Sequence, residues 1–102
     1  MTTDIHHPAV EEIELTAVMH ALSDPARLQV VRTLASEAER TCGTFELGVS
    51  KATASHHFKV LREAGVIRQR QEGTSRLNTL RRDDLEARFP GLLATILSAT
   101  ND

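Results

Sequence analysis

The stretch VSKATASHHFKVLREAGVIRQRQEGTSRLNTLRR, residues 49–82, decides the fold, because it predicts one capped helix followed by a β-hairpin. Ser50 is a good N-cap for this helix, and Gly65 is suited to the left-handed turn that ends it. Two strand-like runs, VIRQRQ and SRLNTL, then flank the turn-forming residues 72–74. The apolar face of the helix is expected to carry Ala54, His57, Phe58, Leu61 and Ala64.

The same segment holds most of the positive charge of the chain. Residues 49–82 carry eight Lys or Arg against two Glu, a net charge of +6. Residues 1–48 carry three Arg against eight acids, and residues 83–102 carry one Arg against four acids, in a chain of net charge −2. Cations gathered on a helix and a hairpin predict a surface for a polyanion, with duplex DNA as the first candidate. Only three Phe, and no Tyr or Trp, are present, which argues against stacking on single-stranded bases.

Apolar spacing predicts further helices on both sides of this segment. A first helical pattern opens at Pro8, and a second begins after Ser23 or Asp24, either of which can cap it, with Pro25 in its first turn. On the second helix, one face is expected to carry Leu28, Val31, Leu34, Ala35 and Ala38.

Two further helical segments complete the pattern. The residues TFEL, between Gly43 and Gly48, leave room for about one helical turn. A last helical pattern begins near Asp83, a plausible cap, and Pro90-Gly91 interrupts it.

These elements predict a mainly α fold with one β-hairpin, a winged helix-turn-helix with a three-helical core and dimerisation helices at both ends. A length of 102 residues suits one domain, expected over residues 9–99, with flexible termini at 1–8 and 100–102. No apolar run is long enough to span a bilayer, and the N-terminus lacks the features of a signal peptide. With a single cysteine, Cys42, the chain is expected to be cytoplasmic.

The chemistry of the helix and hairpin suggests roles in DNA binding. A recognition helix must expose small polar and cationic residues toward the major groove. Short hydrogen-bonding groups suit base edges, and the candidates are Thr53, Ser55 and His56. Cationic side chains suit phosphates, and the candidates are Lys51, Lys59 and Arg62 on the helix with Arg68, Arg70 and Arg76 on the hairpin.

Two stretches, HALSDPARLQVVRTL at residues 20–34 and SKATASHHFKVLREAGVI at residues 50–67, resemble the ArsR/SmtB family of bacterial repressors. The resemblance covers roughly residues 15–85 and implies a homodimeric winged-helix protein that binds operator DNA and dissociates when an inducer binds. By position, Thr53, Ser55 and His56 match the recognition helix of the family, and Arg76 falls within its wing.

The chain departs from the metal-sensing members of that family at two places. The sequence TCGTFELGVS replaces the longer, cysteine-containing text before the recognition helix, and residues 83–99 contain no His. The ligands of both commonly used metal sites are therefore missing. A regulatory divalent metal held across a dimer, for example by His6 or His20 with carboxylates, stays an alternative, as does a nickel- or zinc-responsive regulator.

The remaining His and Cys residues have simpler interpretations. His56 and His57 lie about 100° apart on a helix, so we expect His56 to point at DNA and His57 at the core. His6 and His7 are expected in a polar tail, His20 in a hydrogen-bonded packing role, and Cys42 as a structural thiol. No catalytic motif is present, so we do not expect an enzyme.

A dimer is expected because two recognition helices read a pseudo-palindromic operator. The apolar stripes at the two ends of the chain are the expected interface: Val10, Ile13 and Ala17, with Leu92, Leu93, Ile96 and Leu97. Such a dimer would act as a repressor by excluding polymerase, although DNA binding also permits an activator. The competing class is a winged-helix module that docks another protein through the same face.

Overall fold

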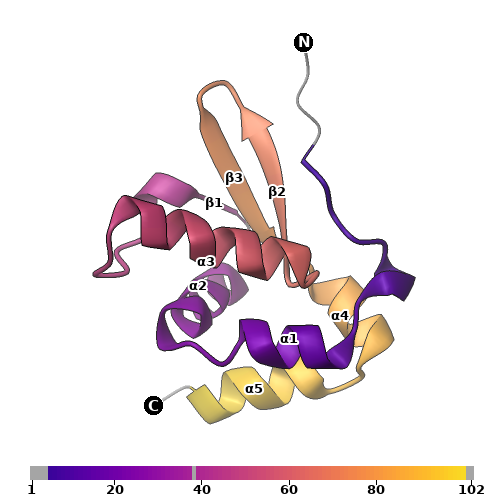
Figure 1. Ribbon diagram of the computed structural model, residues 1–102. Helices are drawn as coiled ribbons and strands as arrows, with labels where there is room; N and C mark the ends of the chain where they lie inside the picture. Colours follow the sequence, from indigo (N-terminus) through magenta and orange to yellow (C-terminus); the bar gives the residue numbers. More distant parts are fainter. Residues whose placement is uncertain (1–4, 38, 101–102) are drawn as a thin grey trace.

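The computed structural model describes residues 5–37 and 39–100, and it confirms a mainly α fold with a β-hairpin (Figure 1). An antiparallel sheet with the strand order β1-β3-β2 is formed by β1 (Arg40–Thr41), β2 (Ile67–Glu72) and β3 (Ser75–Leu80). Two short 3-10 turns, η1 (Val10–Glu12) and η2 (Cys42–Thr44), precede α1 and α3. The helices are α1 (Leu15–Ala21), α2 (Pro25–Ser36), α3 (Lys51–Glu63), α4 (Arg82–Arg88) and α5 (Leu92–Thr100).

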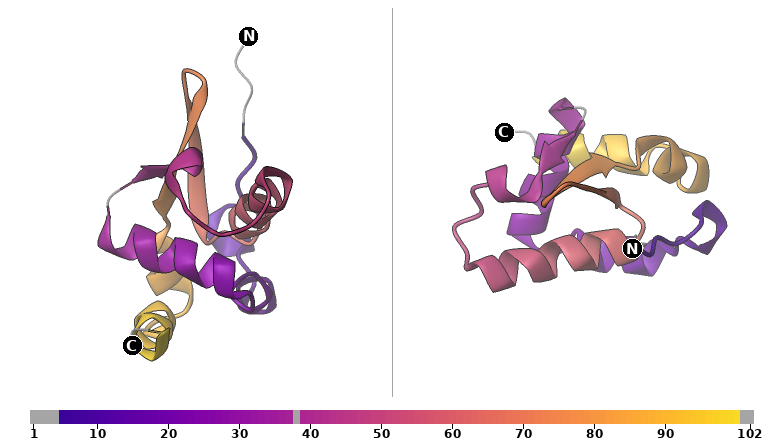
Figure 2. Two further views of the ribbon diagram at one scale, coloured as in Figure 1. Left: turned by 90° about the vertical axis from the view of Figure 1, so that its left-hand side faces the viewer. Right: turned by 90° about the horizontal axis from the view of Figure 1, so that it is seen from above.

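The hairpin forms where the turn residues predicted it. Strands β2 and β3 pair from Ile67 opposite Leu80 to Glu72 opposite Ser75, which leaves Gly73 and Thr74 as the connecting residues. Gly73 has a φ of +62°, a conformation that glycine adopts without steric cost. The hairpin projects away from the helices at one end of the molecule, whereas α5 lies at the opposite end (Figures 1 and 2).

The second helix begins as the sequence predicts. The side chain of Asp24 accepts hydrogen bonds from the backbone N–H groups of Ala26 at 2.8 Å and Arg27 at 3.2 Å, and Pro25 occupies the first turn. Of the two expected caps, Asp24 therefore makes the contact. On the expected inner face, Val31 and Leu34 are buried, Leu28 and Ala35 are half-buried, and Ala38 lies outside the described residues.

The N-terminal helical pattern is interrupted, contrary to the expectation of one continuous helix. The 3-10 turn η1 ends at Glu12, the backbone is extended at Ile13 and Glu14, and α1 then starts. The carbonyl of Ile13 accepts hydrogen bonds from Arg88 Nη2 at 2.6 Å and Nε at 3.0 Å. A tertiary contact thus replaces the helical hydrogen bond of this carbonyl.

The segment before α3 also differs from the sequence prediction. The expected helical turn at residues 44–47 is wrong: the turn is a 3-10 turn over Cys42–Thr44, and the chain is extended from Phe45. The reason is the short strand β1, which pairs Arg40 with Asn78 and draws the chain onto the sheet. Arg40 also donates to the side chain and carbonyl of Thr44, both at 3.0 Å. No α-helix therefore precedes the recognition helix between residues 39 and 50.

The last helical pattern divides at Pro90-Gly91 as expected, into α4 and α5. Asp83 lies in the first turn of α4, and its predicted role as the cap is wrong because Arg81 holds that position without a side-chain cap. Within the described ranges, no helix has the length and apolar character needed to cross a bilayer.

One core joins the helices to the sheet. Gly65, with a φ of +87°, lies so close to Ile13 that a Cβ atom there would fall 2.6 Å from Ile13 Cγ1. This close approach packs the end of α3 on the N-terminal segment. The buried apolar residues are Ile13, Val18, Ala21, Leu22, Val30, Val31, Leu34, Phe58, Leu61, Ala64, Val66, Ile67, Leu85 and Leu93.

Candidate nucleic-acid interface

Helix α3 is built and seated as the recognition helix of the sequence prediction. Ser50 Oγ accepts a hydrogen bond from the backbone N–H of Thr53 at 3.1 Å, which satisfies one of the free donors at the helix start. The predicted inner face is confirmed, since His57, Phe58, Leu61 and Ala64 are buried and Ala54 is half-buried. Phe58 also meets the ring of Phe45 edge-on at 5.3 Å between centroids.

A buried polar cluster fixes α3 against the turn between α1 and α2. Arg27 is only 8% exposed, and its guanidinium Nη1 lies 3.0 Å from His57 Nδ1, within hydrogen-bond distance. Arg27 also donates to the carbonyls of Ala21 at 2.6 Å and His20 at 3.3 Å. His57 Nε2 lies 3.8 Å from the capping carboxylate of Asp24. Because the helix is fixed at this point, its outer face is presented in a defined orientation.

The surroundings of the Asp24 side chain favour its ionised carboxylate form. Desolvation raises the pKa of Asp24, but hydrogen bonds from the backbone of Arg27 and Ala26, with the nearby His57 and Arg27 side chains, lower it overall. The charged carboxylate therefore persists at the N-terminus of α2, where the helix dipole also favours an anion.

The outer face of α3 is exposed and polar. Lys51, Thr53, Ser55, His56 and Lys59 are all exposed. Within residues 5–37 and 39–100, the side chains of Lys51, Ser55 and Lys59 have no hydrogen-bond or ion-pair partner. The Thr53 hydroxyl accepts a hydrogen bond from Ser50 Oγ at 2.9 Å. Three short polar groups and two cations are thus available to an external ligand along one helix face.

The wing arginines divide between the two faces of the sheet. Side chains alternate along a strand, and Gln69 of β2 lies beside α3, so Arg68 and Arg70 point to the opposite face. Arg70 contacts Glu72 at 3.2 Å and Glu39 at 3.5 Å, and Arg68 lies 3.6 Å from Asp84. The hydrogen bond to Glu72, followed by the charge of Glu39, raises the pKa of Arg70.

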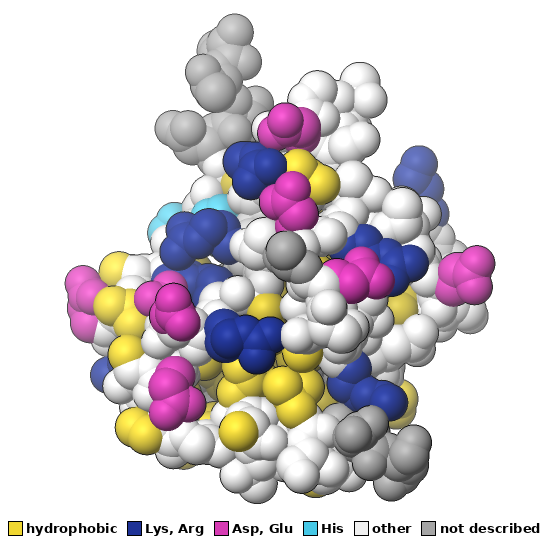
Figure 3. All heavy atoms as spheres, turned by 180° about the vertical axis from the view of Figure 1, so that it is seen from behind, with side chains coloured by type: hydrophobic (Ala, Val, Ile, Leu, Met, Phe, Trp, Pro, Cys, Tyr) yellow, Lys and Arg dark blue, Asp and Glu magenta, His cyan; other side chains and the backbone are white. Residues whose placement is uncertain are grey.

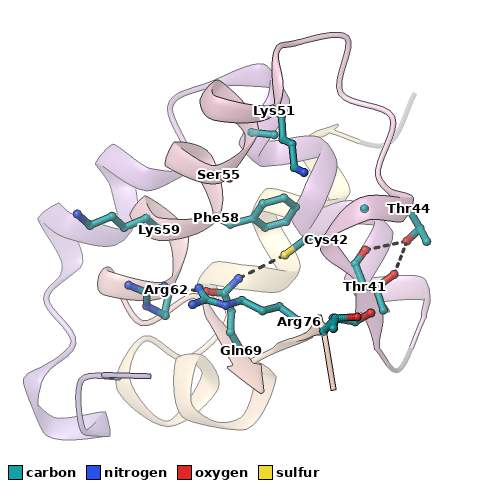
Figure 4. A pocket seen from close by; sticks show the side chains of 14 residues that line it. Thr41, Cys42, Thr44, Lys51, Ser55, Phe58, Lys59, Arg62, Gln69 and Arg76 are labelled. Atoms are coloured by element: carbon teal, nitrogen blue, oxygen red, sulfur yellow. Dashed lines mark hydrogen bonds between the residues drawn. The ribbon is translucent and has the colours of Figure 1, made fainter. Parts of the chain in front are cut away.

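Only part of the predicted cation set therefore comes together. Arg76 of β3 lies on the α3 side, where it lines one cavity with Lys51, Lys59 and Arg62 (Figure 4). Arg68 and Arg70 lie away from this group and have acidic neighbours.

Sequence reasoning missed a polar network that connects α3 to the sheet. Arg62 Nη1 donates to Gln69 Oε1 at 2.8 Å, and Gln69 Nε2 donates to Asn78 Oδ1 at 2.9 Å. Asn78 Nδ2 in turn donates to the carbonyl of Arg40 at 3.0 Å and to Cys42 Sγ at 3.1 Å. Gln69 and Asn78 are almost fully buried. The alternation of Ile67 and Gln69 on the inward side of β2 was the one available signal.

The segment before η1 lies along the free edge of β2. His7 Nε2 accepts a hydrogen bond from the backbone N–H of Gln69 at 2.9 Å, and the carbonyl of Pro8 accepts one from Arg81 Nη1 at 2.8 Å. Burial first, and then the charge of Arg68, lower the pKa of His7. Residues 7 and 8 thus have specific contacts, unlike the flexible end expected over 1–8; residues 1–4 and 101–102 of the expected tails lie outside the described residues.

In the part of the chain that the structure describes, the other histidines and Cys42 do not cluster with further metal-ligating side chains. His20 has an exposed side chain, so its expected packing role is wrong; its carbonyl, not its ring, accepts the bonds from Arg27 and Ser23. The thiol of Cys42 accepts hydrogen bonds from the side-chain amides of Gln69 and Asn78. Among the described residues, no three His, Cys, Asp or Glu side chains are placed to hold a metal ion.

The expected interface stripes are only partly available at the surface. Ile13 is 1% exposed and Leu93 is 6% exposed, so the expectation that these two side chains face a partner is wrong; both belong to the core of the single chain. Val10, Ala17, Leu92, Ile96 and Leu97 are half-buried. Leu15 and Met19 of α1, which the prediction omitted, are exposed by 46% and 55%. Hydrophobic surface gathers in the lower part of the face in Figure 3, at the end where Figure 1 shows α5.

A capped helix with a polar outer face, set beside a hairpin, defines the class of winged helix-turn-helix proteins, and comparison with known proteins supports this assignment. A helix-turn-helix domain family matches residues 22–70. The regulator YceK of Bacillus subtilis, described as an uncharacterized HTH-type transcriptional regulator, is 40% identical over 82 residues, which cover 78% of this chain and 82% of YceK.

Another uncharacterized HTH-type transcriptional regulator, from Methanocaldococcus jannaschii, is 35% identical over 64% of this chain and 76% of its own length. The crystal structure of the transcriptional repressor BigR from Xylella fastidiosa has a TM-score of 0.63 and 28% identity, and the match covers 86% of this chain and 87% of BigR.

The chain belongs to the ArsR-type family of helix-turn-helix transcriptional regulators. It is a DNA-binding regulator of transcription, a class of proteins that are not enzymes.

Proposed function

We propose that the protein is a cytoplasmic homodimeric repressor that binds a pseudo-palindromic operator through α3 and the wing. The observation that supports this most is the outer face of α3, where Ser55, Lys51 and Lys59 are exposed beside Arg76 and have no hydrogen-bond or ion-pair partner in the described part of the chain. Polar groups left unpaired on a helix whose inner face is fixed are suited to an external hydrogen-bonding partner.

The contact set follows from the geometry. Thr53, Ser55 and His56 would meet base edges in the major groove, and Lys51, Lys59, Arg62 and Arg76 would meet phosphates. Arg68 and Arg70 are left out, because they lie on the other face of the sheet and already have carboxylate partners.

The proposed dimer would form through the end of the molecule opposite the wing. Leu15 and Met19 of α1, with half-buried Leu92 and Ile96 of α5, supply apolar surface there. Ile13 and Leu93, which are buried, would pack in the core beneath this apolar surface. Pairing through this end would direct both wings outward and set two recognition helices about one DNA turn apart.

Sedimentation equilibrium tests the dimer. The wild-type chain should sediment as a dimer, and Ile96→Glu should shift it toward the monomer, because a charge would replace apolar contact surface. Gln71→Glu on the wing is the matched control and should sediment like the wild type. A monomeric wild type, or equal behaviour of Ile96→Glu and the control, contradicts the dimer.

Fluorescence anisotropy tests DNA binding on duplexes tiled across the promoter of the gene itself, at two salt concentrations. The proposal predicts tighter binding to one promoter fragment than to random duplex, and weaker binding to both at higher salt. A protein-docking module predicts weak, salt-insensitive contact with every duplex. In a reporter strain, deletion of the gene should raise transcription from the bound promoter, whereas lowered transcription would indicate an activator.

A further inference from the structure

A cavity of about 860 Å³ lies between α3, the wing and the 3-10 turn η2 (Figure 4). It opens where the chain before α3 forms a short turn instead of an α-helix. Its size is in the range of sites for small organic ligands. Its lining includes Cys42, Gly43, Ser55, Phe58, Arg62 and Arg76.

One part of the cavity wall is apolar and ordered. Phe58 is 4% exposed and is held by its edge-on contact with Phe45. Cys42 is half-buried, and its Sγ accepts hydrogen bonds from Asn78 at 3.1 Å and Gln69 at 3.5 Å. Because the thiol group already has these partners, Cys42 and Phe58 together make this part of the wall weakly polar.

The charged side chains that line the cavity are all cationic. Four cations line the cavity, and no Asp or Glu is among its lining residues. Arg62 is anchored by Gln69, yet its Nε atom is buried without a hydrogen-bond partner in the described part of the chain. A buried donor left unpaired costs free energy that an anionic oxygen would recover.

The second guanidinium comes from the wing. Figure 4 shows the side chain of Arg76 extending from the wing toward Arg62 and Gln69. The Nε atom of Arg76 donates to Gln71 Oε1 at 3.3 Å, and its terminal nitrogens have no hydrogen-bond partner among the described residues. Two like charges that approach each other without a carboxylate between them are stabilised by an anion placed there. The Lys59 ammonium points outward in the same view, away from this pair.

We propose that this cavity binds a small organic carboxylate, with its head group between Arg62 and Arg76 and a flat apolar body against Phe58 and Cys42. The carboxylate would displace DNA, because it occupies cations and the Ser55 side of α3 that the operator needs; this second statement rests on the proposed function. The ligand would then be the inducer of the proposed repressor.

The first experiment measures binding alone. 1-Naphthoate is titrated into the ¹⁵N-labelled full chain, with 1-naphthylmethanol as the neutral analogue and phenyl phosphate as the alternative head group. A ligand of this size should saturate with a Kd of about 1 mM. Amide shifts should centre on residues 42–44, 54–62 and 69–76. The neutral analogue should bind at least about tenfold more weakly, because it makes no charge-assisted hydrogen bonds.

Two variants separate the cavity from the surface. Arg62→Gln should weaken 1-naphthoate at least about tenfold. Gly43→Leu should abolish its binding by filling the cavity, since a Cβ atom at Gly43 meets nothing within 4 Å. Gly43→Ala is the matched control for the backbone and should bind normally. The folded state of every variant is checked by its amide spectrum.

The second experiment measures competition. With a Kd near 1 mM, 5 mM 1-naphthoate should raise the apparent Kd for duplex DNA about sixfold per site in wild type and Gly43→Ala. Gly43→Leu should bind DNA like the wild type but resist 1-naphthoate.

The outcomes distinguish the two proposals. Absence of saturable binding by either anion, or equal binding by Gly43→Leu, overturns the ligand site even when DNA binds normally. Tighter binding of phenyl phosphate than of 1-naphthoate overturns the assignment of a carboxylate. Saturable binding that depends on Arg62, without any binding to duplex DNA, retains the site and overturns the proposed operator function.

Discussion

Replacing Lys59 with alanine should reduce the salt dependence of DNA binding by an amount that the structure allows us to calculate. The chain presents four cations on the α3 side of the wing without an ion-pair partner among the described residues: Lys51, Lys59, Arg62 and Arg76. A dimer that neutralises one phosphate with each cation should show a slope of log K against log salt of about −7. Removal of Lys59 from both protomers should change this slope to about −5.

The affinity ratio between 50 and 200 mM salt makes this difference measurable. The wild type should lose about 10⁴-fold in affinity over this range, and Lys59→Ala about 10³-fold. Fluorescence anisotropy with one labelled duplex, at four or more salt concentrations, gives both slopes. The loss should be similar on operator and random DNA, because a phosphate contact carries no base information.

Arg70→Ala is the control for this measurement. It removes the same charge, but Arg70 lies on the opposite face of the sheet and contacts Glu72 and Glu39. Its slope should stay within about half a unit of the wild type. Equal slopes for wild type and Lys59→Ala, or an equal change in both variants, would refute the assignment of the DNA-binding face to α3.

Three further predictions concern base reading, packing and pH. His56→Ala should reduce the preference for operator over random duplex about 5- to 100-fold in competition binding; equal losses on both duplexes would remove His56 from the base-reading set. Gly65→Ala should lower the free energy of unfolding in urea by about 2–5 kcal/mol, because alanine would adopt a left-handed φ there and its Cβ would clash with Ile13. Gly73→Ala also places alanine at a left-handed φ but in open space, so it should lower the free energy of unfolding by only about 1–2 kcal/mol. Equal losses in the two variants would contradict the packing of Gly65 on Ile13. Because the pKa of His7 is lowered in the folded state, the contribution of His7 to stability is complete above the unfolded pKa of about 6.5 and is lost as pH falls below that value. His7→Gln keeps a hydrogen-bond acceptor without a titrating group, so it should lose less unfolding free energy than the wild type between pH 7.5 and 5.5. An equal loss in the variant and the wild type would contradict this prediction.

The recognition helix and the wing could be predicted because their signals are local. Ser50, Gly65 and the apolar spacing between them define one helix, and Gly73 defines one two-residue turn. These features depend on residues within a few positions of each other, so tertiary contacts have little opportunity to override them.

The contacts that orient these elements depend on distant residues and were missed for that reason. The pairing of Arg40 with Asn78 forms a strand of only two residues, too short for any periodic pattern. It also decides that Gln69 and Asn78 turn inward toward Cys42. Likewise, Arg88, 75 residues along the chain, donates a hydrogen bond to the carbonyl of Ile13, at the point where the first helical pattern is interrupted.

The division of the cations was also beyond sequence reasoning. Net charge identified residues 49–82 as the cationic segment, but charge alone treats Arg70 and Arg76 as equivalent. Strand alternation and the inward position of Gln69 place them on opposite faces of the sheet.

The most direct test of the central claim is a footprint of the purified protein on the promoter of its own gene at low salt. The account predicts two protected half-sites related by a two-fold axis, with their centres about one helical turn or a multiple of it apart. It also predicts protection in the major groove that Ser55→Ala and His56→Ala weaken on the same bases. Uniform or absent protection on every promoter fragment, in a sample whose amide spectrum shows a folded chain, would contradict it.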